Sequence, residues 1–305
     1  MVSIKWLKKG KIFTAKKNHN WMMSHAALPF ADKISNESYR IYFSSRDIKN
    51  RASIGFLEIN IKNPKKIICL SNKPVLSPGS IGNFDDSGVL NSCIVSKKNK
   101  KFLYYTGWNL TNNVPFRWSI GLAVSIDGGK TFKKYSEGPI LDRNYIDPYF
   151  IASPTVIIDK GLWKMWYISG NKWKLNDNGK WNAPYQIKYA ESEDGINWNR
   201  KGIVCIKLRK DENGIGRSTI IKEKDEYRMW YPYSTDRYRI GYAESIDGIK
   251  WNRKDKLVGI NISDKGWDSE SIEYPSIFIH NKIKYMLYNG NGFGKTGFGY
   301  ATSAQ

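Results

Sequence analysis

The chain has 305 residues, of which 49 are Lys or Arg and 28 are Asp or Glu, so its formal net charge is +21. Hydrophobic residues make up 41% and aromatic residues 14%, which excludes a disordered chain because so many large side chains can form a substantial core. The chain lacks an apolar run of 18 residues and the apolar core of a signal peptide, so we expect a cytoplasmic protein without a membrane partner. Its three cysteines and three histidines lack ligand spacing and predict neither a disulfide framework, a metal nor another cofactor.

The basic charge is dispersed rather than clustered. Lysines occur in ones and twos, and the longest cluster, Lys97–Lys101, coincides with an expected hairpin turn. Nucleic-acid binding is typically served by basic residues gathered on one face. Lys, Ile and Asn share adenine/thymine-rich codons, so genome composition explains much of the charge. We therefore expect no nucleic-acid partner, and a polyanion partner stays open as the lesser alternative.

A five-residue run of aromatic and apolar residues recurs along the chain. Such a run is too short for a helix and is typical of a buried strand. The runs end 57 to 64 positions apart. In chain order they are Tyr39–Phe43, Lys101–Tyr105, Trp163–Tyr167, Tyr227–Tyr231 and Lys284–Tyr288.

A second apolar run follows each aromatic run. Three of these second runs lead into an Asp-Gly turn that is closed by an aromatic residue, namely Ser125–Phe132, Ser192–Trp198 and Ser245–Trp251. Asp-Gly between two strands is a strong hairpin signal because glycine adopts a positive φ without strain. Another glycine-rich stretch, Asn289–Gly297, lacks phosphate-loop spacing and is interpreted as a turn between strands.

A third apolar run precedes each aromatic run, with Ile94, Val156, Ile220 and Ile277 at equivalent positions and Leu28 in the corresponding region of the first unit. Five repeated units of three or four strands predict an all-β fold, a five-bladed β-propeller, as a single domain over residues 1–305. We expect the segment Trp6–Phe13 to supply the outermost strand of the last blade. Two β-sandwich domains are the alternative, which the uninterrupted repeat disfavours.

Polar side chains occur where the innermost strands of such a propeller begin. These strands converge on a central channel, so residues at their starts face one another at one end. Carboxylates come from the second, third and fifth units, and candidate cations from the first and fourth. The stretches are His25–Pro29, Phe84–Asn91, Ile146–Ser153, Gly214–Arg217 and Trp267–Tyr274.

The repeat, the Asp-Gly turns and the polar strand starts resemble five-bladed glycosidase-like propellers related to glycoside hydrolase families 32, 43 and 130. The resemblance covers essentially the whole chain. Four stretches are more closely similar to glycosylase-like proteins of bacterial surface-polysaccharide gene clusters. They are Arg40–Asp47, Asn83–Gly88, Ile187–Ser192 and Tyr288–Tyr300.

The resemblance implies a pair of carboxylates, one acting as acid and the other as base or nucleophile. It assigns the second-blade aspartate to Asp86, or to its neighbour Asp85, and a fifth-blade carboxylate to Glu273. The third-blade glutamate is replaced by Ala152, and Asp147 is the nearest substitute. We therefore predict that Asp86, Glu273 and Asp147 are catalytic. The structural alternatives are a turn cap for Asp86, a salt bridge for Glu273 and a turn for Asp147.

Seven residues are predicted to bind substrate. His25 is a candidate base or ligand for a sugar or phosphate, and Arg46 and Arg217 suit an anionic group because guanidinium forks match phosphate and carboxylate. Arg46 and Asp47 form a simple ion pair in the alternative interpretation. The full set is His25, Arg46, Asp47, Asp85, Arg217, Tyr274 and Trp108.

Two classes of function remain. The first is a glycosidase-like enzyme, a hydrolase or transglycosylase, which acts on a bacterial sugar that is anionic or phosphate-linked; its ligand would be a carbohydrate or a sugar nucleotide. The second is a propeller that binds carbohydrate in polysaccharide metabolism without catalysis, which the incomplete carboxylate set favours. The sequence does not fix the oligomeric state.

Overall fold

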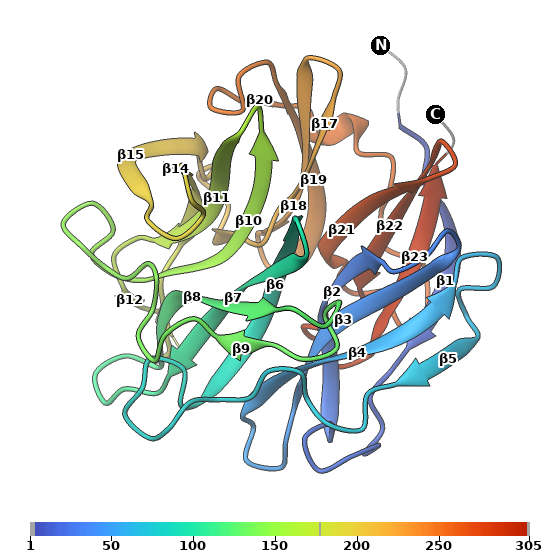
Figure 1. The fold of residues 1–305 in the computed structure, drawn as a ribbon. Coiled ribbons are helices and arrows are strands. Elements are labelled where there is room, and N and C mark those ends of the chain that lie inside the picture. The colour runs from blue at the N-terminus through green and yellow to red at the C-terminus, as the bar shows by residue number, and fades with distance from the viewer. Residues whose placement is uncertain (1–3, 177, 304–305) are drawn as a thin grey trace. The chain divides into compact units, whose positions relative to one another are not determined.

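The computed structural model describes residues 4–176 and 178–303 and consists almost entirely of β-strands (Figure 1). Within these ranges the one helical element is a short 3-10 turn, η1 (Asp255–Leu257). No helix of the described chain is long and apolar enough to cross a membrane. The predicted all-β class is therefore confirmed.

The chain forms two compact units. The first unit comprises Met1–Val75, Ser218–Pro232 and Arg237–Gln305. The second comprises Leu76–Arg217 and Tyr233–Asp236.

The first unit contains three sets of four antiparallel strands among its described residues. The first set pairs β2 (Ser24–Lys33), β3 (Ser38–Arg46), β4 (Ala52–Asn60) and β5 (Ile67–Leu70) in that order. The fourth set pairs β17 (Thr219–Glu223), β18 (Glu226–Ser234, whose last two residues belong to the second unit), β19 (Tyr238–Ser245) and β20 (Asn252–Arg253). The fifth set pairs β21 (Glu273–His280), β22 (Ile283–Asn289), β23 (Phe298–Ser303) and β1 (Leu7–Phe13).

The second unit contains two further sets of the same kind. The second set pairs β6 (Gly88–Lys97), β7 (Lys100–Asn109), β8 (Arg117–Ser125) and β9 (Lys133–Lys134). The third set pairs β10 (Ile151–Asp159), β11 (Leu162–Gly170), β14 (Tyr185–Ser192) and β15 (Asn199–Ile206). A hairpin of β12 (Lys174–Leu175) and β13 (Trp181–Asn182) joins β11 to β14, and β16 (Gly214–Ile215) runs parallel to β14.

Each predicted aromatic run lies in the second strand of its set, namely β3, β7, β11, β18 or β22. In β11 the side chains of Trp163, Met165, Trp166 and Tyr167 are all buried. A strand with neighbours on both faces is apolar throughout rather than at alternate positions, which explains why the run reads as continuous. The predicted edge strand is also confirmed, because β1 pairs with β23 at the margin of the fifth set.

The Asp-Gly turns are confirmed and have a common hydrogen-bond pattern. The hydroxyl group of Ser125 donates to Asp127 (2.7 Å) and accepts from the Gly129 amide (2.9 Å), and Gly128 has a φ of 73°. Asp127 also accepts from the amides of Lys130 and Thr131. Although burial opposes the charged form, the hydrogen bonds from the Ser125 and Thr131 hydroxyl groups, followed by these amides, hold the pKa of Asp127 below its usual range. These aspartates are therefore turn caps.

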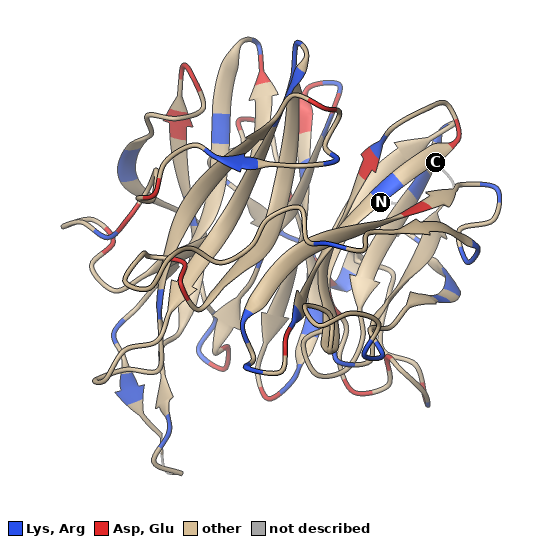
Figure 2. Cartoon of the chain, turned by 60° about the horizontal axis from the view of Figure 1, so that its bottom comes forward, with Lys and Arg blue, Asp and Glu red and all other residues tan. Residues whose placement is uncertain are grey.

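Charged residues are spread over many strands and loops, with acidic residues between the basic ones (Figure 2). This distribution agrees with the dispersed lysines of the sequence.

Candidate active site

A β-bulge marks the start of three first strands. In β21 the register shifts between Glu273 and Ser276, and Tyr274 has a φ of 50°. In β10 the register shifts between Ala152 and Thr155, and the equivalent residue, Ser153, has a φ of 51°. A bulge bends the strand and redirects a side chain, so Glu273 and Ala152 occupy matching, redirected positions. The start of β2 repeats the pattern at Leu28, with a φ of 57°.

Glu273 is a buried carboxylic acid with one unused oxygen. Its side chain is enclosed, with the residue only 2% exposed. Oε1 accepts a hydrogen bond from the Ser271 hydroxyl (2.8 Å) and from the Phe293 amide (3.4 Å). Oε2 has no hydrogen-bond partner among the described residues. Burial raises the pKa of Glu273 to about 7, because removal from water disfavours the charged form.

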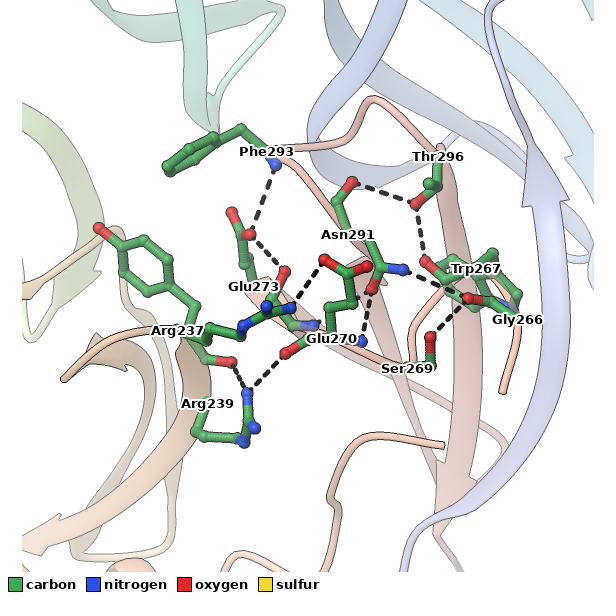
Figure 3. A network of polar contacts seen from close by, with 12 residues as sticks. Arg237, Arg239, Gly266, Trp267, Ser269, Glu270, Glu273, Asn291, Phe293 and Thr296 are labelled. Carbon is green, nitrogen blue, oxygen red and sulfur yellow. Dashed lines mark hydrogen bonds and ion pairs between the residues drawn. The ribbon is translucent and has the colours of Figure 1, made fainter. Parts of the chain in front are cut away.

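Asn291 holds together the two loops that donate to Glu273 (Figure 3). Its side-chain oxygen accepts from the amides of Glu270 (2.8 Å) and Ser271 (3.1 Å). Its side-chain nitrogen donates to the Gly266 carbonyl at 3.2 Å. The two loops that carry Ser271 and Phe293, the donors to Glu273 Oε1, are therefore joined to each other through Asn291.

The start of β2 is bound to the same loop. Asn289 accepts from the Leu28 amide (2.8 Å) and donates to the Ala26 carbonyl (2.7 Å). The Ala26 amide in turn donates to Gly294 at 2.9 Å. These bonds fasten the first set to the loop that carries Phe293, so both lie at one site within the first unit.

His25 lies beside two cations at this site. Burial, followed by the positive charges of Arg46 and Lys295, lowers the pKa of His25 to about 4. The imidazole is therefore neutral at pH 7 and accepts or donates a hydrogen bond rather than supplying charge. Its Nδ1 lies 2.9 Å from the Ser24 hydroxyl, and the residue has a φ of 62°.

Arg46 retains its charge in a partly desolvated position. Burial lowers its pKa, and Tyr274 lies near enough to influence that pKa. One guanidinium nitrogen donates to Asn50 at 3.0 Å. Asp47 pairs with Arg51 (2.8 Å), which disfavours the alternative of an ion pair between Arg46 and Asp47. The structure thus brings His25, Arg46, Glu273 and Tyr274 together within the first unit.

The second unit holds the remaining predicted residues. Asp86 caps a turn, with its oxygens accepting from the Gly82 amide (3.0 Å) and the Ser87 hydroxyl (2.8 Å). Asp85 is buried, accepts a hydrogen bond from Tyr105 at 3.0 Å and forms an ion pair with Lys134 at 2.6 Å. The neighbouring aspartates therefore have different environments, and only Asp86 is accessible.

Asp147 is surrounded by four donors. Tyr167 (2.9 Å) and Ser169 (2.7 Å) donate to it, and Lys188 (2.8 Å) and Arg200 (2.9 Å) form ion pairs with it. Although burial opposes the charged form, the Lys188 and Ser169 hydrogen bonds lower the pKa of Asp147. The carboxylate is therefore ionised and saturated, and these contacts favour a structural role.

Arg217 and Trp108 pack within the second unit. Arg217 is 1% exposed, and one of its nitrogens donates to the Ser92 carbonyl at 3.2 Å. The Trp108 indole lies over Gly88, where an added Cβ would come within 1.8 Å of its nitrogen. Substrate binding by either residue stays a prediction.

Two aromatic residues at the first-unit site did not emerge from the sequence. Phe293 lies 5.8 Å from Tyr238, and Tyr238 lies 6.5 Å from Tyr274, between ring centroids. Phe293 belongs to the stretch interpreted as a glycine-rich turn. The one aromatic side chain among the small residues of this stretch was the sequence feature that could have indicated Phe293.

Comparison with known proteins supplies both a sequence relative and a fold. No family profile matches the chain. "Uncharacterized protein Rv1502" of Mycobacterium tuberculosis (strain ATCC 25618 / H37Rv) is 40% identical over 297 residues, which cover 97% of this chain and 98% of that protein. "1,2-beta-oligomannan phosphorylase" of Thermoanaerobacter sp. (strain X514) is 26% identical over 159 residues, or 49% of this chain and 53% of that protein.

Solved structures share the fold over almost the whole chain. A beta-1,2-mannobiose phosphorylase from Listeria innocua, in complex with beta-1,2-mannobiose, matches with a TM-score of 0.70 and 12% identity, covering 99% of this chain and 96% of that one. A thermostable family-43 glycoside hydrolase matches with a TM-score of 0.66 and 17% identity, covering 96% and 91%. The resemblance to glycosidase-like proteins is confirmed at the level of the fold.

Proposed function

The chain belongs to the same family as the Mycobacterium tuberculosis protein Rv1502, and we propose that it is an enzyme that cleaves or transfers a glycosidic bond. One observation carries the proposal. Glu273 is a buried carboxyl group with a raised pKa and an oxygen without a partner among the described residues. Buried acids with raised pKa values are typical of proton donors in catalytic sites.

Glu273 has the properties of a general acid. Such a group must hold its proton near neutral pH and pass it to the departing glycosidic oxygen. Ser271 and Phe293 both donate to Oε1, so Oε2 is the oxygen that remains to carry and deliver the proton. Catalysis by Asp86 stays a prediction; within the second unit its carboxylate is accessible and bonded only within its turn in the described chain. Catalysis by Asp147 stays a prediction, which its four donors disfavour.

The proposed substrate is a sugar that carries an anionic or phosphate-linked group. Arg46 and Lys295 supply positive charge beside neutral His25. An approaching anion would stabilise the protonated imidazole of His25, which would then be a third cation beside Arg46 and Lys295. The phosphorylases among the compared proteins add phosphate as a candidate co-substrate, and a sugar nucleotide fits the same charge.

The finer points of fold and setting are proposals as well. We propose that the five sets of strands are the blades of one five-bladed propeller over residues 1–305, and that β1 closes it through its pairing with β23. We further propose that the enzyme serves bacterial polysaccharide metabolism in the cytoplasm.

A carbohydrate-binding protein without catalysis is the second candidate. The observation in its favour is Ala152, which takes the bulge position that Glu273 takes in the fifth set and is buried. Alanine offers no proton at that position. This candidate predicts that sugars bind but are never transformed.

The experiment compares Glu273→Gln with wild type on a panel of neutral and anionic oligosaccharides and sugar nucleotides, with and without inorganic phosphate, by product analysis. Glutamine keeps the shape of the side chain but has no acidic proton to transfer. Glu270→Gln is the matched control, because Glu270 is a nearby carboxylate that pairs with Arg237 in solvent. The proposal expects turnover by wild type and the control, and its loss in Glu273→Gln. Turnover by Glu273→Gln at the wild-type rate contradicts it, as does a wild type that binds without turnover.

A further inference from the structure

Phe293 is an exposed aromatic residue in a strained backbone conformation next to the buried acid. Its φ is 56°, and the residue is 49% exposed. Glycine adopts such a φ freely, whereas a side chain with Cβ is disfavoured there. Strain of this kind persists where the surroundings enforce it and tends to occur at functional sites.

The loop around Phe293 is held on both sides. Gly294 accepts from the Ala26 amide at 2.9 Å, and the Asn291 side chain accepts from the Glu270 and Ser271 amides. An added Cβ at Gly294 would lie 2.8 Å from the Ala26 carbonyl oxygen, so the loop packs tightly against β2. These contacts hold the backbone of the loop from which the Phe293 ring projects.

The ring and the acid are positioned by the same residue. The Phe293 amide donates to Glu273 Oε1 at 3.4 Å, and Figure 3 shows Phe293 beside the Glu273 carboxyl group, with its ring turned away from Asn291. On one side the ring meets Tyr238 edge-on, with 5.8 Å between centroids. Tyr238 in turn lies 6.5 Å from Tyr274, the residue that follows Glu273.

From this arrangement we propose that Phe293, supported by Tyr238, forms the aromatic surface against which the sugar ring at Glu273 lies. Pyranose rings have an apolar face of C–H groups, which packs on an aromatic face. A ring held there is placed beside the acid by the same peptide unit that orients Oε1. Phe293 thereby binds the ring that carries the reacting bond, and Tyr238 keeps the Phe293 ring in place. The inference rests on the proposed function.

The test uses Phe293→Gly, because this change removes the ring but keeps the amide that donates to Glu273. Glycine also relieves the positive φ, so the variant is expected to unfold at the same temperature as wild type or a higher one. Phe293→Tyr keeps an aromatic face, and Phe293→Leu keeps an apolar side chain without one. Ile246→Ala is the control, since Ile246 is 75% exposed in the turn after β19.

Each variant is made in the Glu273→Gln background and titrated with beta-1,2-mannobiose and a panel of other hexose disaccharides. We expect Phe293→Gly and Phe293→Leu to lose at least about tenfold in affinity, and Phe293→Tyr and Ile246→Ala to stay within about twofold. Affinity within twofold in Phe293→Gly, or full rescue by leucine, overturns the aromatic surface. If Glu273→Gln loses turnover but Phe293→Gly binds with unchanged affinity, this inference is rejected and the proposed function stands. If the parent binds neither a disaccharide nor any anionic sugar or sugar nucleotide of the activity panel, or Glu273→Gln retains full turnover, the proposed function fails.

Discussion

Tyr167 donates a hydrogen bond of 2.9 Å to Asp147, which lies 20 residues earlier in the chain. The same relationship recurs at the same separation in two other sets. Tyr105 donates to Asp85 at 3.0 Å, and Tyr288 donates to Asp268 at 3.1 Å. Each tyrosine is in the second strand of its set, and each aspartate lies in the segment that precedes the first strand.

A lysine completes each pair. Asp147 binds Lys188 at 2.8 Å, Asp85 binds Lys134 at 2.6 Å and Asp268 binds Lys8 at 2.7 Å. In the fourth set Tyr231 donates to Asp255 at 2.6 Å, and Arg253 supplies the cation at 2.9 Å. Because the same contacts recur at this spacing, the architecture of the repeat explains them. Asp147 belongs to this repeated set of contacts, and Glu273 does not.

The first prediction concerns Asp147→Asn. The substitution leaves Lys188 and Arg200 beside a neutral group in a buried site, and we expect it to lower the free energy of unfolding by about 3 kcal/mol or more. Asp86→Asn, in an accessible turn, should cost less than about 1 kcal/mol. Urea unfolding of both variants measures the difference. Equal stability of the two variants would refute the structural role of Asp147.

The second prediction concerns Asp86 as a catalytic carboxylate. We expect Asp86→Asn to keep the wild-type circular dichroism spectrum and to lose glycan turnover. The change conserves shape, so its turn bonds with Gly82 and Ser87 are largely retained. Product analysis of the folded variant decides the matter, and full activity would remove Asp86 from the mechanism.

The third prediction follows from the effect of Glu273 on stability. Its pKa is about 7 in the folded chain against an ordinary value of 4.5, so folding favours the protonated form. Stability is then highest below about pH 4.5 for this group and declines as pH rises to about 7, by roughly 3 kcal/mol in all. Glu273→Gln removes the titration, so its stability relative to wild type should increase between pH 5 and pH 8. A pH-independent difference in urea unfolding would contradict the raised pKa.

The fourth prediction concerns anion binding by His25, Arg46 and Lys295. Sulfate keeps a constant charge near neutral pH, whereas His25 is neutral there because its pKa is about 4. A bound anion raises that pKa, so sulfate should bind more tightly as pH falls from 7.5 to 5.5. Arg46→Gln should weaken binding, and Lys62→Gln, which removes an exposed lysine paired with Glu37, should not. Calorimetry that finds equal affinity at both pH values would contradict the coupling.

The regular features of the fold could be predicted from the sequence because the repeat makes them visible. Runs such as Trp163–Tyr167 and turns such as Asp127-Gly128 are local patterns, and each indicates a single type of local structure, a buried strand or a hairpin turn. The environment of a carboxylate is different, since it depends on residues distant in the chain. Asp147 depends on Lys188 and Arg200, and no local pattern of the sequence indicates those pairs.

Glu273 illustrates both sides of this limit. Its position two residues before Pro275 could be found in the sequence, whereas its burial and the amide of Phe293 could not. Phe293 itself was hidden in a stretch whose glycines indicate only a turn. Its proposed role depends on a backbone conformation held by the contacts of Ala26 and Asn291.

The most direct test of the account is the titration of Glu273 itself. Carbon-13 NMR of protein labelled at the glutamate carboxyl carbon, with Glu273→Gln to assign the signal, measures its pKa in the folded chain. We predict a midpoint near pH 7, in step with a decline of glycan turnover as pH rises through the same value. A midpoint near the ordinary value of 4.5 would contradict the assignment of Glu273 as the proton donor.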